Sequence, residues 1–160
     1  MSHVRNKGDF MLKKAWLLRL LLNIWPPFLF TGIKVTEISS DFRQAKVRLK
    51  MRFWNKNALG THFGGALFSM TDPFYVLMIL ARLGNKYYVW DKSADIDFIK
   101  PGVGVVKAEF YVSDDFINEI IENTCHGEKY QPTVSVSVKN NDGELVAQLN
   151  RRLYIRQKNK

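Results

Sequence analysis

The sequence has 160 residues, of which 46% are hydrophobic and 24% are charged, enough for one globular domain with a sizeable core. Its single cysteine, Cys125, excludes an intramolecular disulfide, so we expect a reducing, cytoplasmic setting. The net charge of +9 indicates an anionic partner, such as nucleic acid, a membrane surface or a phosphorylated ligand, but charge that serves only solubility explains it equally well.

The N-terminal segment combines a polar tail, residues 1–10, with an apolar stretch, residues 11–25. Arg19 interrupts this stretch, and Pro26-Pro27 ends it before the roughly 20 residues that a membrane span needs. We predict an amphipathic helix that docks on its own domain. The alternative is a weak contact of residues 11–25 with a membrane surface.

The next segment reads as sheet. Gly32–Ser39 predicts a first strand, and Lys46–Phe53 alternates strictly between apolar residues and four cations. A row of cations on one face of a strand could bind phosphate, but a solvated sheet face is the commoner explanation. We therefore divide the chain into residues 1–30, the tail and helix, and residues 31–160, the main domain.

The stretch from Asn57 to Leu83 is the central helical segment. Gly64 and Gly65 stand where the helix should begin, so a ligand could closely approach free backbone N–H groups there. Asp72 is the one carboxylate inside the apolar run, and a charge among apolar residues must be paired or useful. Pro73 predicts a kink at Thr71–Asp72 that leaves a carbonyl near Ser69 unpaired.

The remaining segments predict mostly strands with turns between them. We expect a helix over Ser113–Asn123 and strands over residues 105–112, 133–139 and 145–156, with a hairpin turn at Asn141-Asp142-Gly143. Residues 87–92 and 93–99 predict either one long strand or two short ones. One long helix followed by successive antiparallel strands predicts an α+β fold. The curved antiparallel sheet, of five to six strands, should wrap round the long central helix.

Several of these residues occur in a familiar order. Asn57, Gly60, Gly64-Gly65 and Asp72 resemble the Asn–x–x–Gly, Gly-Gly–x6–Asp arrangement of acyl-CoA thioesterases with the hot-dog fold, above all the phenylacetate-type enzymes. Two later segments also resemble that superfamily, namely Ile96–Gly102 (IDFIKPG) and Asn141–Ala147 (NDGELVA). The resemblance spans roughly residues 30–157, and its combined order is more specific than any single piece.

The sequence departs from the superfamily at one position. The residue before Gly-Gly is usually His, but here it is Phe63, and His62 lies one residue earlier. A branch of uncharacterised thioesterase-like proteins shares this Phe-Gly-Gly form and an added N-terminal helix. The shift leaves the glycine amides and Asp72 in place, but it questions any role that depends on histidine, so a structural role for His62 is favoured.

The resemblance implies hydrolysis of an acyl-CoA thioester without a cofactor. Asp72 would activate water or attack the carbonyl, and Gly65 N–H would polarise the carbonyl. Asn57 would hold the water or substrate, although it is as readily explained as a turn residue. The substrate-binding residues would be Gly64, His62, Phe63, Arg151 and Arg152, the two arginines holding nucleotide phosphates.

The helical spacing of the two main candidates predicts the assembly. Gly65 and Asp72 are seven residues apart, so on a continuous helix they share a face but lie roughly 10 Å from each other. One carbonyl cannot be held by the first and attacked by the second. If both residues act, two antiparallel chains must share each site, which predicts a homodimer. The resemblance implies the same arrangement, often as a dimer of dimers.

Two other functions remain open. One is a hot-dog protein that binds acyl ligands without turnover, and the other is a basic protein that binds nucleic acid or a membrane surface. Cys125-His126 would form a catalytic dyad only if the two side chains converged, which adjacent residues at a helix end rarely do. Three scattered histidines and one cysteine show no metal-ligand spacing, so we predict no metal.

Overall fold

We describe a computed structural model that covers residue 12 and residues 14–158. The predicted polar tail, residues 1–10, lies outside the described residues. The helices are α2 (Ala15–Ile24), α3 (Pro26–Thr31), α4 (Gly64–Ser69), α5 (Phe74–Leu83) and α6 (Asp114–Glu122). The strands are β1 (Ile33–Ile38), β2 (Gln44–Lys50), β3 (Tyr87–Phe98), β4 (Val105–Tyr111), β5 (Lys129–Tyr130), β6 (Thr133–Asn140) and β7 (Leu145–Gln157).

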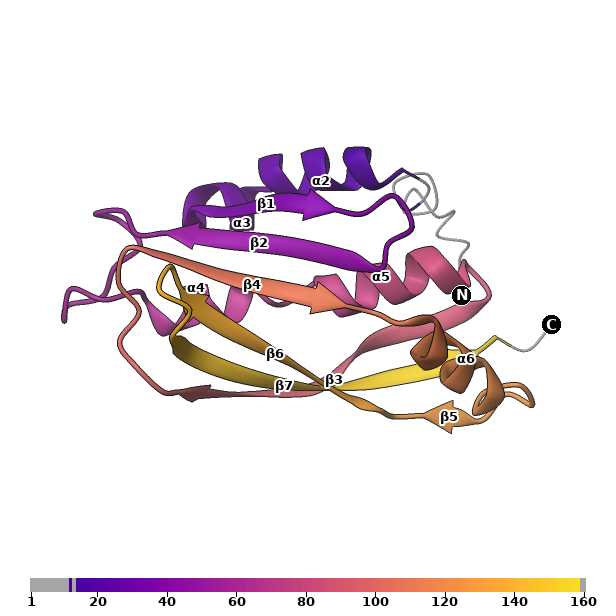
Figure 1. Cartoon of the computed structure of the whole chain (residues 1–160). Helices are drawn as coiled ribbons and strands as arrows, with labels where there is room; N and C mark the ends of the chain where they lie inside the picture. Colours follow the sequence, from indigo (N-terminus) through magenta and orange to yellow (C-terminus); the bar gives the residue numbers. More distant parts are fainter. Residues whose placement is uncertain (1–11, 13, 159–160) are drawn as a thin grey trace.

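All seven strands form one antiparallel sheet in the order β1-β2-β4-β6-β7-β3, and the short β5 pairs with β7. The sheet is one strand larger than predicted because β5 has only two residues and carries no alternating pattern. Figure 1 shows the sheet curving round α5, while α2 lies outside, along the edge formed by β1. This arrangement is the predicted α+β fold with an extra N-terminal helix.

The core lies between the curved sheet and the central helix. Phe74, Met78 and Ile79 of α5 are buried against inward residues of the strands, such as Phe110 and Leu149. Phe74 and Phe110 stack with ring centroids 4.5 Å apart. Residues Gly64–Leu83 are long and apolar enough to cross a membrane by length and composition, but the sheet that wraps them explains their apolar character as core packing.

The prolines act as expected in one place and differently in another. Helix α2 ends at Ile24 as predicted, but Pro26 begins α3 because a proline at the first helical position loses no hydrogen bond. The kink at Pro73 is confirmed, since α4 ends at Ser69 and α5 begins at Phe74. The predicted unpaired carbonyl is wrong, because Asp72 N donates to Ser69 O at 3.2 Å and tightens the turn.

The strand predictions fail mainly at their ends. Strand β2 stops at Lys50, so Phe53, predicted to be the last residue of this strand, lies on an exposed loop. The cations at Lys46, Arg48 and Lys50 lie on the outer side of β2, and Lys46 pairs with Glu37, which supports the solvated-face interpretation. The division at residue 30 stays a prediction, and α3 runs across it.

Candidate active site

The first candidate region is the start of helix α4. Phe63 occupies the N-cap position in an extended conformation and has no side-chain acceptor for the first amides. The first intrahelical bonds come from Ala66 N and Leu67 N to Phe63 O, which leaves the Gly64 and Gly65 N–H groups without a partner among the described residues. Two free amides therefore point from this end of the helix, as the glycine pair predicted.

Two aromatic rings explain why both positions are glycine. A methyl group at Gly64 would lie 2.9 Å from Cζ of Phe98, and one at Gly65 would lie 2.7 Å from Cζ of Phe63. Both rings are more than half exposed, so they cover the glycines at the surface and are not part of the core. Any larger residue at 64 or 65 would have to displace a ring.

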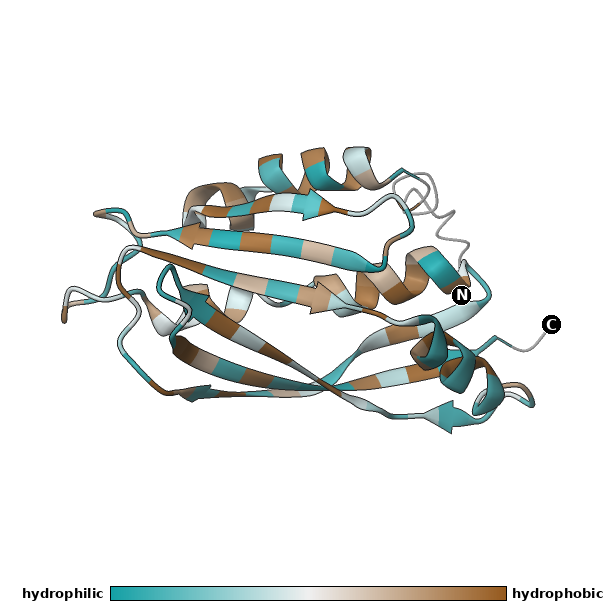
Figure 2. Cartoon of the chain, viewed as in Figure 1, coloured by the Kyte–Doolittle hydropathy of each residue, from teal (hydrophilic) through white to brown (hydrophobic). Residues whose placement is uncertain are grey.

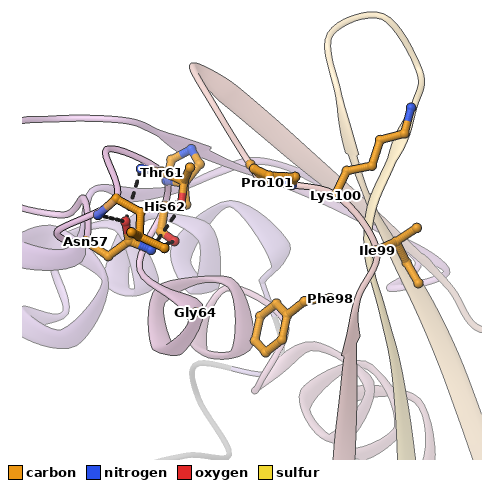
Figure 3. A pocket seen from close by; sticks show the side chains of 10 residues that line it. Asn57, Thr61, His62, Gly64, Phe98, Ile99, Lys100 and Pro101 are labelled. Atoms are coloured by element: carbon orange, nitrogen blue, oxygen red, sulfur yellow. Dashed lines mark hydrogen bonds between the residues drawn. The ribbon is translucent and has the colours of Figure 1, made fainter.

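A cleft of about 600 Å³ opens beside Gly64, while Gly65, the next residue of the helix, is not among its lining residues. Its walls come from the loop before α4 and from the end of β3 with the turn after it (Figure 3). The lining residues are Asn57, Leu59, Thr61, His62, Gly64, Phe98, Ile99, Lys100, Pro101 and Gly102. The structure thus brings Asn57, His62 and Gly64 of the predicted site together in one wall.

Asn57 organises the loop that forms this wall. Its Oδ1 accepts hydrogen bonds from Leu59 N at 3.0 Å and Thr61 N at 3.1 Å. Its Nδ2 donates to Thr61 Oγ1 at 2.9 Å, as Figure 3 shows. These bonds define an Asx-type turn, so the structure favours the turn interpretation of Asn57 over direct contact with substrate.

His62 is buried in the same wall. Its Nε2 lies 3.2 Å from Gly104 O and acts as donor there, which assigns the neutral tautomer with an acceptor lone pair on Nδ1. Nδ1 is buried without a hydrogen-bond partner in the described part of the chain. Burial lowers the pKa of His62 below 6.5, so the side chain is neutral at physiological pH and supports the wall structurally.

Asp72 lies in the turn between α4 and α5, and its side chain is 54% exposed. The expectation of a charge deep inside an apolar helix was therefore wrong. The kink at Pro73 turns the carboxylate out of the helix and toward solvent, although Thr71 just before it and Phe74 two residues after it are buried. An exposed carboxylate in this position can be approached by a ligand or by another chain.

Arg151 holds that carboxylate from inside the protein. It is only 1% exposed, and its Nη1 lies 2.7 Å from Asp91 Oδ2 and 3.3 Å from Asp72 Oδ1. Its Nη2 donates to Thr71 Oγ1 at 3.0 Å, and the guanidinium lies 4.9 Å from the Phe68 ring centre. We name Asp72, Arg151 and Asp91 the charged cluster.

The charged cluster corrects the prediction for Arg151. A guanidinium that is buried and bound by two carboxylates cannot also hold nucleotide phosphates at the surface. Arg152, the next residue on β7, is exposed and faces the other side of the sheet. The two arginines were predicted to act together, but strand alternation separates them.

Asp91 is the member of the cluster that sequence reasoning missed. Burial raises the pKa of this carboxyl, the Arg151 charge opposes that rise, and the nearby charge of Asp72 adds to it. Its Oδ1 is buried without a partner in the described residues. One signal was available: Arg151 occupies an inward position between Leu149 and Leu153, where a buried arginine requires a carboxylate.

A narrow apolar groove of about 560 Å³ runs beside the same turn. It lies between α2 and the start of α5, and Pro73, the residue after Asp72, forms part of its wall. All its lining residues are apolar: Leu18, Leu21, Leu22, Ile24, Trp25, Pro26, Pro73 and Leu77. An aliphatic chain attached to a group at Asp72 could extend into it.

The remaining candidates are not brought together. Asp72 does not line the cleft that contains Gly64, and α4 separates the two within one chain. Cys125 is exposed and donates to Glu122 O, and His126 uses only its backbone N–H, which meets Glu128. Among the described residues no group of three His, Cys, Asp or Glu side chains could hold a metal ion.

Residues 13–155 match the family model described as "Domain of unknown function (DUF4442)". The chain belongs to this family. No curated protein matches the chain.

Solved structures share the fold of this DUF4442 protein. A probable thioesterase of unknown function, PA5026 from Pseudomonas aeruginosa, has a TM-score of 0.80 at 19% identity, over 89% of this chain and 95% of that chain. The PaaI protein from the phenylacetic acid degradation operon of E. coli has a TM-score of 0.61 at 16% identity, over 86% of this chain and 88% of that chain. Thioesterase HI1161 from Haemophilus influenzae has a TM-score of 0.66 at 10% identity, over 92% of this chain and 93% of that chain. The predicted hot-dog fold is confirmed.

Proposed function

We propose that this protein hydrolyses acyl thioesters, such as acyl-CoA, at sites shared between two copies of the chain. The observation that carries the proposal is Asp72, an exposed carboxylate that a buried arginine holds at a helix kink. A carboxylate that is accessible to solvent and hydrogen-bonded to an arginine is suited to activate water or to attack a thioester carbonyl. The names of the structural neighbours, two of which are thioesterases or probable thioesterases, support the same class of reaction.

The cleft beside α4 would receive the thioester. Gly65 N–H is proposed to hydrogen-bond the carbonyl oxygen, with Gly64 permitting close approach between the Phe63 and Phe98 rings. Asn57 is proposed to contribute indirectly, by fixing the conformation of the loop that lines the cleft. His62 is proposed to contribute by supporting the cleft wall from inside. Lys100 at the rim, rather than the buried Arg151, would meet a phosphate, after release from its ion pair with Glu144.

The need for two chains follows from the separation of the candidates. In one chain Asp72 lies after the end of α4, whereas the free amides lie at its start. An antiparallel partner would place its own Asp72 at the cleft, and a dimer of dimers would repeat the arrangement. The apolar groove beside Pro73 would then hold the acyl chain.

Hydrolysis of an acyl-CoA series from butyryl-CoA to palmitoyl-CoA tests the proposal. The free thiol product can be followed with a thiol reagent, in a Cys125→Ser background because Cys125 is exposed and would react. We expect turnover by this background protein and loss of most turnover in Asp72→Asn, which keeps the shape but removes the base. Retention of acyl-CoA without turnover would instead favour the acyl-binding alternative, and unchanged turnover in Asp72→Asn would remove that residue from the mechanism.

A further inference from the structure

Both polar side chains of helix α2 hydrogen-bond to the backbone of strand β1. Of its ten residues only Arg19 and Asn23 are polar. Asn23 Nδ2 donates to Val35 O at 3.0 Å, and Asn23 Oδ1 accepts from Val35 N at 2.8 Å. Arg19 Nη1 donates to Thr36 O at 3.2 Å. These bonds satisfy the free edge of β1, which would otherwise be open to pairing with another strand.

As a result, α2 presents apolar side chains to solvent. Trp16, Leu20 and Ile24 recur at intervals of four residues and therefore form one stripe, and all three are exposed. A surface helix of a globular protein normally carries polar residues there, because its apolar stripe faces the core. Here the core already takes Leu18 and Leu22, and the outer stripe stays exposed in the part of the chain that the structure describes.

The apolar surface continues beyond α2. Leu29 and Phe30 of α3 are exposed, and Trp54 Nε1 donates to Phe30 O at 2.9 Å, which ties the loop after β2 to α3. Phe53, at the tip of that loop, is 81% exposed and meets Trp54 edge to face. In Figure 2, brown hydrophobic segments recur along α2, between teal and pale ones, and continue into α3. We name this the N-terminal apolar surface: Trp16, Leu20, Ile24, Leu29, Phe30, Phe53 and Trp54.

The net charge of the protein is concentrated in the same part of the chain. Residues 1–71 contain 12 lysines and arginines and three acidic residues, a balance of +9, whereas residues 72–160 contain 12 of each. Residues 10–36 and 42–71 contain no acidic residue at all. Seven exposed cations in the described part of these segments form no ion pair: Lys14, Arg19, Lys34, Arg48, Lys50, Arg52 and Lys56.

These cations and apolar side chains are interleaved. Trp16, Leu20, Lys34 and Arg48 line one hollow beside α2, and the Arg52 guanidinium lies 5.8 Å from the Trp54 ring centre. Such a surface does not suit a second copy of the chain, because two strongly positive surfaces would repel each other. Nucleic acid would match the charge and could stack on the aromatic rings, but it offers nothing to the exposed aliphatic side chains of Leu20, Ile24 and Leu29.

We propose that the N-terminal apolar surface docks on an anionic lipid bilayer. Helix α2 would lie in the plane of the interface, with Trp16, Leu20 and Ile24 among the acyl chains and the surrounding cations on lipid phosphates. The loop tip at Phe53 and Trp54 would insert beside it, since tryptophan is favoured at the boundary between lipid and water. This proposal does not depend on the proposed catalytic activity.

Co-sedimentation of the full chain with vesicles tests the proposal. We expect binding to vesicles of phosphatidylcholine mixed with phosphatidylglycerol, little binding to phosphatidylcholine alone, and weaker binding as salt is raised. The double variant Ile24→Ser, Phe53→Ser should lose at least about tenfold in partitioning because two large apolar groups are removed. Its matched control is Tyr111→Ser, Ile121→Ser, which removes an exposed aromatic and an exposed isoleucine elsewhere and should bind normally.

A charge variant provides an independent measurement. Lys50→Gln with Lys56→Gln alters only exposed side chains and should weaken binding to anionic vesicles about fivefold per cation. The proposal is overturned if neither vesicle binds the protein, if both bind it equally at all salt concentrations, or if the two double variants of apolar residues behave alike. A change of oligomeric state in Ile24→Ser, Phe53→Ser, measured by light scattering without loss of vesicle binding, would assign the surface to a second copy instead.

Discussion

Arg151, almost fully buried on the inner side of β7, lies 3.3 Å from the exposed carboxylate of Asp72. The pair joins the concave face of the sheet to the kink of the central helix. Asp91 of β3, at 2.7 Å, is the closer carboxylate to Arg151, so the arginine is shared. The position of Asp72 therefore depends on two residues that lie far from it in the sequence.

The first prediction concerns the stability of the charged cluster. Arg151→Met should lower the free energy of unfolding by about 3–5 kcal/mol, because it leaves Asp91 partly buried without a cation. Arg152→Met, one residue along on the exposed face, should change stability by less than about 0.5 kcal/mol. Urea unfolding measures both, and adding Asp91→Asn to Arg151→Met should recover part of the loss. Equal stability of the two single variants would show that the cluster contributes nothing to the fold.

The second prediction is a pH dependence from His62. Because burial lowers its folded-state pKa below 6.5, the unfolded chain binds the proton more readily. The stability that neutral His62 contributes is therefore complete above pH 6.5 and is lost as pH falls toward the folded-state pKa, with a slope of at most about 1.4 kcal/mol per pH unit. His62→Gln should remove this part of the pH dependence. Parallel curves for the two proteins between pH 7 and pH 5 would contradict it.

Asp91 should act in the opposite direction at lower pH. Its folded-state pKa is raised above 3.8, so the folded chain binds this proton more readily. Between 3.8 and the raised pKa, the contribution of Asp91 to stability increases as pH falls. Asp91 is present in both proteins, so its contribution cancels when the free energy of unfolding of His62→Gln is subtracted from that of the wild type at each pH. The difference then reports His62.

The third prediction tests whether each site needs two chains. Gly65→Pro removes the proposed N–H donor, and Asp72→Asn removes the base, so each protein alone should be nearly inactive. After unfolding and refolding together, random pairing makes about half of the dimers mixed, each with one intact site, so about a quarter of wild-type activity should return. Activity of the refolded mixture is the measurement.

Gly65→Ala is the control for that experiment. Its methyl group would meet the Phe63 ring as proline does, but it keeps the N–H group. It should therefore retain much more activity than Gly65→Pro. An inactive mixture that contains mixed dimers, shown by differential tagging, would remove Gly65 from the proposed mechanism.

The fourth prediction assigns the apolar groove to the acyl chain. Leu21→Trp adds bulk to the groove wall and should lower kcat/KM for palmitoyl-CoA at least about tenfold while leaving butyryl-CoA largely unaffected. Leu20→Trp makes the same change one residue away, outside the groove, and should leave the ratio of the two substrates unchanged. If both variants shift the ratio equally, the effect belongs to α2 as a whole and not to the groove.

Local sequence rules predicted those parts of the fold that neighbouring residues determine. Pro73 has no N–H group, so the break between α4 and α5 could be placed within two residues. Ser113 accepts a hydrogen bond from Phe116 N and starts α6 where the acidic first turn indicated. The glycine pair marked the start of α4 correctly, but only part of its requirement for space is local: Gly65 faces the nearby Phe63 ring, whereas Gly64 faces Phe98 at the distant end of β3.

Tertiary structure decided how the charged residues are used. Period-two alternation already places Arg151 inward beside Leu149 and Leu153, but only the pairing of β3 with β7 brings Asp91 to it across 60 residues of sequence. The apolar residues around Asp72 suggested a charge inside the helix, and the kink that the same sequence encodes turned it outward. Local patterns determine which face of an element a residue occupies, whereas its charge partner and exposure depend on which elements pack against that face.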